Sequence, residues 1–214
     1  MKVLKVILVV FLAGLFGCSG MYYGAMEKIG IHKRDILRDR VQEARDAQKE
    51  AKQQFLTALE QFKSVVKFQG GDLEKEYDKL NATLQKTEAE ATEVRKRVRS
   101  VEDVAGALFA EWRSEIKQYS SESLRQSSQR KYDLTRNKYQ ELIQAMKKAE
   151  AKLEPALVPM RDQVLFLKHN LNARAIAGLR QEVAEVQGQV DRLIRDIESA
   201  IAEADAFIAA LRES

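Results

Sequence analysis

Apolar residues recur along most of this chain at alternating steps of four and three positions, which is the spacing of one buried stripe on an α-helix. Four such stripes cover residues 37–65, 73–112, 132–171 and 176–211. The second stripe is unbroken over more than five heptads and contains Leu73, Tyr77, Leu80, Leu84, Thr87, Ala91, Val94, Val98, Val101, Ala105, Leu108 and Trp112. The pattern therefore predicts four long amphipathic helices that bury their stripes against one another.

The breaks between the stripes carry the local chemistry of helix ends. Gly70 and Gly71 suit a helix C-terminus, and Asp72 suits the N-cap of the helix that follows. Ser120-Ser121 offers a second cap, and the stripe jumps by five positions after Leu171, so it cannot continue in phase. We expect helices at about residues 27–69, 72–119, 121–171 and 173–212.

Short connections between long helices make neighbours antiparallel. At 1.5 Å per residue each helix would span roughly 60–75 Å. The predicted fold is all-α, an elongated antiparallel four-helix bundle with a coiled-coil-like core, in which Gly70 and Asn170 share one tip. Pro155 and Pro159 fall inside the third helix, where they predict a kink or, alternatively, the true turn.

The first residues have the three-part pattern of an export signal. Lys2 and Lys5 precede the uncharged apolar run 6–16, and the small residue Gly17 follows. A run of about eleven residues is too short to span a bilayer, which needs roughly 20. Cys18 comes next and is the only cysteine of the chain, so no disulfide stabilises the exported part.

The residues Leu15-Phe16-Gly17-Cys18 resemble the lipobox of bacterial lipoproteins, although an ordinary signal with a chance cysteine is the alternative. The resemblance implies cleavage after Gly17, a diacylglyceryl thioether on Cys18 and an acyl group such as palmitate on the new amino terminus. Ser19 then implies sorting to the outer membrane, facing the periplasm. The expected layout is a signal peptide at 1–17, a lipidated N-terminus and tether at 18–26, and the helical bundle at 27–214.

Charge gives little support to nucleic-acid binding. The chain has 36 basic and 32 acidic residues, and removal of Lys2 and Lys5 with the signal leaves 34 against 32. The densest basic cluster is Arg95-Lys96-Arg97 with Arg99, next to stripe positions. We interpret it as a solvated helix face rather than a phosphate site, with Arg97 exposed.

The sequence shows no motif of an enzyme. It has no G-x-x-x-x-G-K-[ST] phosphate loop and no G-x-S-x-G nucleophile elbow. His32 and His169 are the only histidines, and neither has a His or Cys partner at metal-ligand spacing. We expect no catalytic residue, no metal, no cofactor, no ATP and no nucleic-acid partner. The aromatic stripe members are expected in the core.

Four segments are more specific than periodicity: 22–37, 70–73, 107–112 and 162–176. Together they resemble an uncharacterised family of bacterial lipoproteins classed as a domain of unknown function, over essentially the whole exported part. Members often carry an automatic "DNA repair ATPase" label, which the missing phosphate loop argues against here. The resemblance implies an exported helical protein and brings no ligand or catalytic residue.

The functional expectation is therefore a lipid-anchored helical scaffold of the cell envelope that docks an envelope protein. A bundle that carries a lipid or another apolar ligand is the alternative. Lys168, His169 and Arg174 form the candidate partner-binding tip, because helix capping by Asn170 and Asn172 does not explain them.

Overall fold

The computed structural model describes residues 32–67, 72–170 and 173–213. These ranges form four α-helices and contain no strand: α3 (Lys33–Val66), α4 (Leu73–Ile116), α5 (Glu122–His169) and α6 (Ala173–Glu213). The predicted all-α helical bundle is confirmed. None of these helices combines the length and the apolar character that a membrane crossing requires. The predicted signal, Gly17, Cys18 and the tether lie outside the described residues.

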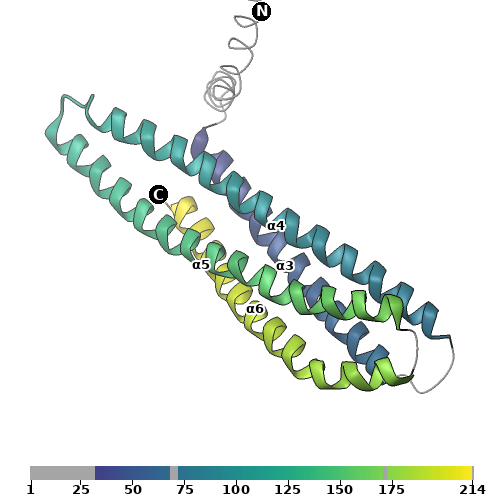
Figure 1. The fold of residues 1–214 in the computed structure, drawn as a ribbon. Coiled ribbons are helices and arrows are strands. Elements are labelled where there is room, and N and C mark those ends of the chain that lie inside the picture. Colours follow the sequence, from purple (N-terminus) through teal and green to yellow (C-terminus); the bar gives the residue numbers. More distant parts are fainter. Residues whose placement is uncertain (1–31, 68–71, 171–172, 214) are drawn as a thin grey trace, which may run out of the picture.

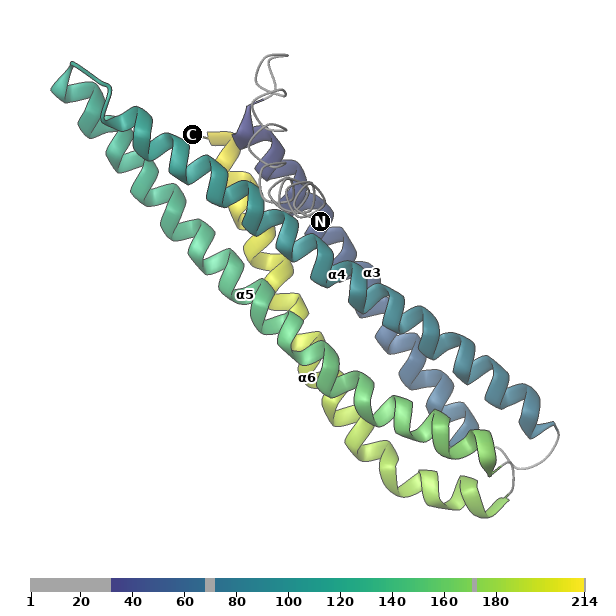
Figure 2. The same cartoon turned by 45° about the horizontal axis from the view of Figure 1, so that its top comes forward.

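The helices run up and down in chain order, each antiparallel to the next (Figures 1 and 2). Helix α3 packs on α4 and α6, and α5 packs on the same two helices, so the four form a closed ring around one core. The ends of α3 and α5 and the starts of α4 and α6 meet at one end of the rod (Figure 1). This end is called the distal tip below.

The core is made of the predicted stripes. Every stripe member of α3 is buried, and so are the central members of the other three helices. The stripe members that are only partly buried are Leu73, Tyr77, Leu108, Trp112, Tyr139 and Val183. Three buried stripe positions are polar. Thr87 donates a hydrogen bond to the Thr83 carbonyl at 2.8 Å, Thr135 lies near one end, and Gln48 is completely buried in α3.

The helix ends follow local capping chemistry. The Asp72 side chain accepts a hydrogen bond from the Lys75 amide at 3.1 Å, and Ser121 accepts one from the Leu124 amide at 3.5 Å. Asn170 ends α5, and its side-chain amide donates to the Phe166 carbonyl at 2.9 Å. The capping interpretation of Asn170 is therefore confirmed, while Asn172 lies outside the described residues.

Both prolines lie inside α5, so the alternative of a turn at this point is wrong. Neither proline has an amide hydrogen, so two hydrogen bonds are missing from the helical ladder within five residues. Pro155 is exposed and Pro159 is half-buried, so the gaps lie away from the core stripe. Helix α5 changes direction in its C-terminal part, which contains these prolines (Figures 1 and 2).

The helices are unequal, because α4 has 44 residues and α5 has 48, whereas α3 has 34 and α6 has 41. The excess lies opposite the distal tip, where the turn between α4 and α5 projects beyond the start of α3 and the end of α6 (Figures 1 and 2). Lys33 in the first turn of α3 pairs with Glu111 at 3.0 Å, so residues 113–131 continue past this level without α3 and α6 beside them. These residues are called the overhang below.

Candidate docking surfaces at the two ends of the rod

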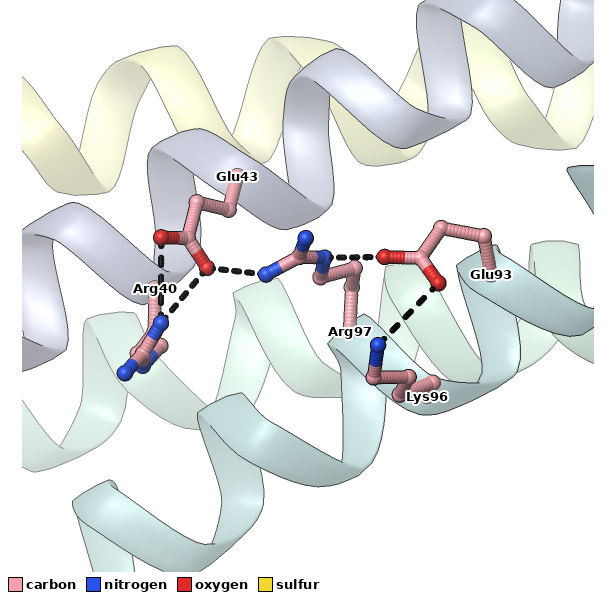
Figure 3. Close-up of polar contacts among 5 residues, drawn as sticks. All are labelled: Arg40, Glu43, Glu93, Lys96 and Arg97. Carbon is pink, nitrogen blue, oxygen red and sulfur yellow. Dashed lines mark hydrogen bonds and ion pairs between the residues drawn. The ribbon is translucent and has the colours of Figure 1, made fainter.

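The middle of the rod is covered by ion pairs between helices. Arg97 of α4 hydrogen-bonds Glu43 of α3 at 2.5 Å and Glu93 of its own helix at 2.6 Å, and Arg40 also pairs with Glu43 (Figure 3). The Arg97 guanidinium lowers the pKa of the Glu93 carboxyl below its ordinary value. The prediction that Arg97 is exposed is wrong: its side chain is half-buried between α3 and α4.

Two further members of the basic cluster are also matched by acidic groups. Lys96 lies 3.4 Å from Glu93 (Figure 3), and Arg95 lies 3.0 Å from Glu154 of α5. Arg161 of α5 contacts both Glu154 and Glu88. Cations with fixed carboxylate partners have little free charge to offer a phosphate. The geometry favours the interpretation of this cluster as a solvated helix face.

Charge pairing extends along the other helix–helix seams. Cross-helix pairs join α3 to α6, α4 to α5 and α5 to α6, with N–O distances of 2.5–2.8 Å. The pairs are Arg45–Asp205, Lys52–Glu198, Lys147–Glu102 and Lys148–Asp196. Exposed pairs of this kind contribute little stability each. Their effect is a surface on which charges of both signs alternate, so the middle of the rod presents no strong field to a partner.

At the distal tip, Lys168 and His169 are exposed in the last turn of α5. Arg174 belongs to the first turn of α6, and its side chain lies outside the described part of the chain. Arg180 donates a hydrogen bond to the Val66 carbonyl at 3.3 Å, which joins the beginning of α6 to the end of α3. The structure places the three predicted residues at one end of the rod by their position in the helices.

Replacement of Lys168, His169 and Arg174 by alanine together tests the predicted tip. The side chains of Lys168 and His169 are exposed, so the variant is expected to keep its helicity, with less than about 0.5 kcal/mol change in unfolding free energy. Under the predicted docking role, the variant is also expected to stay in the membrane fraction and to lose crosslinks to the predicted envelope partner, measured by in-cell crosslinking and mass spectrometry. Unchanged crosslinks would contradict the prediction that the tip binds a partner. Lost helicity would show that the three replaced residues have a structural role.

The opposite end has a groove that sequence reasoning missed. It has a volume of about 390 Å³ and opens between α4 and α5 at the overhang, next to the start of α3 and the end of α6. Its apolar lining comes from Leu108, Trp112, Tyr119, Leu124 and Leu211. A second groove of about 340 Å³ runs between α5 and α6 beside it and shares Lys131, Thr135 and Leu211 with the first.

An aromatic cluster forms the base of the overhang. The ring of Tyr132 packs edge-on against Phe109 and Trp112, with ring centroids 5.6 and 5.7 Å apart. The Trp112 indole nitrogen donates to the Ser128 hydroxyl at 2.9 Å and so joins α4 to α5. Tyr139 packs on Phe109 at 5.4 Å, and burial raises the pKa of its phenol to about 12. The predicted core role of these aromatic residues is confirmed by their packing.

Large apolar side chains are exposed around the overhang. Tyr119 is 39% exposed, Leu124 is 57% exposed, and Leu134 is 64% exposed on the next turns of α5. The sequence held a signal for this surface. The core stripe stops at Trp112 and resumes at Tyr132, although helix formers continue on both sides of the turn. The helical residues between Trp112 and Tyr132 have no core stripe, which is what we expect where α3 and α6 do not cover α4 and α5.

No group of three or more His, Cys, Asp or Glu side chains within residues 32–67, 72–170 and 173–213 is arranged to hold a metal ion. The chain matches no curated protein in sequence. A family model, described as "Protein of unknown function (DUF2959)", matches residues 22–211, which takes in α3, α4, α5, all but the last two residues of α6, and ten residues before the first described one. The chain therefore belongs to this family of unknown function.

Proposed function

We propose that the protein is a lipid-anchored, non-enzymatic scaffold of the bacterial cell envelope, which holds a partner protein at a fixed distance from a membrane. The observation that carries the proposal is the uninterrupted core. Stripe positions are filled by buried side chains along four helices, and the surface between the ends is covered by paired charges. A rigid rod with a neutral shaft acts through its two ends.

The anchor belongs at the end of the rod where α3 begins. Cys18 precedes Lys33 by 15 residues, and Lys33 pairs with Glu111 at the base of the overhang. Two or three acyl chains on one residue hold a protein on a bilayer firmly, unlike a single chain. With the lipid at this end, the distal tip with Lys168 and His169 points away from the membrane and meets the partner. Ser19 favours the periplasmic face of the outer membrane.

The scaffold is favoured over the carrier of an apolar ligand by the packing of the core. A carrier needs an apolar space that encloses most of its ligand. The two grooves near the overhang, of about 390 and 340 Å³, are open to solvent and lie at one end of the rod, so neither encloses a ligand within the core. The central stripe members, such as Val98, Leu153 and Leu193, belong to one apolar core and have no exposed surface.

Cys18→Ser tests the anchor. A hydroxyl in place of the thiol cannot form the thioether, so the variant is expected to lose lipidation and normal cleavage after Gly17. The measurements are incorporation of labelled palmitate and gel mobility of the chain in fractionated cells. Ser19→Ala is the matched control and is expected to incorporate palmitate like the unaltered chain. A Cys18→Ser variant that is processed normally and stays with the membrane would contradict the proposal.

A further inference from the structure

We propose that the overhang, residues 113–131, is a second membrane contact that docks on an anionic phospholipid surface next to the anchor. This inference rests on the proposed function in one respect, which is that the chain is tethered to a bilayer near residue 18. The structural observation is the conjunction of three properties at one end of the rod. The overhang projects furthest there, it carries the surplus positive charge, and it exposes apolar side chains.

The first property is position. The overhang comprises four residues of α4, the turn and ten residues of α5, which is about 6 Å of helix on the α4 side and about 15 Å on the α5 side. The 15 residues from Cys18 to Lys33 span at most about 50 Å. A tether of this length allows the projecting turn to reach the bilayer that holds the anchor. The distal tip lies at the other end of α3, about 50 Å from the start of this helix, so only a fully extended tether running along the rod would bring it to the same bilayer.

The second property is charge. The overhang has five basic residues against two acidic ones within 19 positions, and the rest of residues 18–214 then has 29 basic against 30 acidic. The surplus positive charge of the exported chain therefore lies wholly in the overhang. Arg125 pairs with Glu122 of its own helix, while Lys117 and Arg130 are exposed on the two sides of the turn. Clustered cations near a bilayer are attracted by anionic headgroups.

The third property is the exposure of apolar side chains. Tyr119 lies in the turn and Leu124 in the first turn of α5, and both are exposed beside the cations. Aromatic and aliphatic side chains interleaved with Lys and Arg are the composition of segments that rest in the headgroup layer. A protein partner with an acidic face would match the cations as well. A bilayer is favoured over an acidic protein, because the proposed tether keeps the overhang permanently close to the bilayer surface.

The test is vesicle co-sedimentation of a chain that starts at residue 19, which has no lipid of its own. The buried core of the described residues lies between Lys33 and Leu211, so this chain contains every one of these core residues. Vesicles of equal parts phosphatidylglycerol and phosphatidylcholine are compared with vesicles of phosphatidylcholine alone. We expect binding to the anionic vesicles that weakens as salt is raised, because the attraction is screened.

The informative variant is Lys117→Glu with Arg130→Glu, which reverses two exposed cations of the overhang. It is expected to bind the anionic vesicles about tenfold more weakly or worse. The matched control is Lys86→Glu with Arg99→Glu, which reverses two exposed cations on the shaft of α4 and changes the net charge equally. The control is expected to bind within about twofold of the unaltered chain. Circular dichroism checks that both variants keep the helical bundle.

Equal losses in the two variants, or equal binding to both kinds of vesicle, would overturn the inference. Failure to sediment, together with loss of an in-cell protein crosslink in the overhang variant, would also overturn it and assign the surface to an acidic protein partner. The assay is independent of lipidation at Cys18. A failed anchor experiment therefore refutes the proposed function, whereas a failed vesicle experiment refutes only the docking of the overhang.

Discussion

Val98→Asp is expected to destabilise the bundle by several kcal/mol or to prevent it from folding. Val98 has no exposed surface and lies in the middle of the α4 stripe, between Val94 and Val101. An isolated carboxylate in an apolar core either loses its hydration or must take up a proton, and both cost free energy. The neighbouring Arg97 cannot compensate, because its guanidinium is held by Glu43 and Glu93 at the surface.

The measurement is chemical denaturation followed by circular dichroism. Thr92→Asp is the matched control, because Thr92 is exposed on the same helix and the change in charge is the same. Arg95 and Lys96 follow at three and four positions, where a new carboxylate is tolerated or slightly favourable. The control should shift the unfolding free energy by less than about 0.5 kcal/mol. Equal denaturation midpoints for the two variants would refute the assignment of this stripe to the core.

Gln48→Met is expected to stabilise the bundle, in contrast to Val98→Asp, and to raise the unfolding free energy by about 1–3 kcal/mol. Gln48 is completely buried in the α3 stripe, and neither its amide nitrogen nor its amide oxygen has a hydrogen-bond partner among the described residues. A buried polar group without a partner retains the full cost of its desolvation. Methionine is unbranched like glutamine and fills a similar space, but it has no amide oxygen or nitrogen to desolvate.

Comparison with Gln53→Met, an exposed position on the same helix, separates burial from helix propensity. That variant is expected to change stability by less than about 0.5 kcal/mol. A less stable Gln48→Met variant would show that the amide has a polar partner in solution. A single polar residue in an apolar stripe is a known device for fixing the register of packed helices. Two-state unfolding of the Gln48→Met variant would indicate that this bundle does not depend on that device.

The bundle was predictable because its information is local and periodic. Each of the residues from Leu37 to Val65 at alternating steps of three and four is buried, since a stripe repeated over many heptads has one partner surface available. The turns were also readable, because Asp72 and Ser121 satisfy amides that a helix start leaves unpaired. Pro155 left two alternatives open in sequence, and the buried residues on either side of it resolve them in favour of a continuous helix.

The environment of Arg97 and the overhang were less predictable, because both depend on how distant helices lie beside each other. Arg97 follows the stripe residue Val94 by three positions and precedes Val98, so its sequence position puts it at the boundary of the core. Only the neighbouring helix decides whether such a residue faces water or a carboxylate, and here α3 supplies Glu43. The overhang depends on where α3 and α6 stop relative to α4 and α5. The gap in the stripe between Trp112 and Tyr132 marks these residues in the sequence, but how far α3 and α6 extend beside them is a relation between distant segments that the local pattern does not contain.

The unequal helix lengths also make the rod uneven as a mechanical object. Between the distal tip and the Lys33–Glu111 pair it is four helices thick, and beyond that pair it is two helices thick. The resistance of a beam to bending grows steeply with its thickness, so a sideways load on the rod bends it first where the section narrows. The Trp112–Ser128 hydrogen bond and the contact of Tyr132 with Trp112 lie where the four-helix section ends. They join α4 to α5 there and stiffen this point. A sideways pull at the distal tip is therefore expected to tilt the four-helix section as one stiff body about this point.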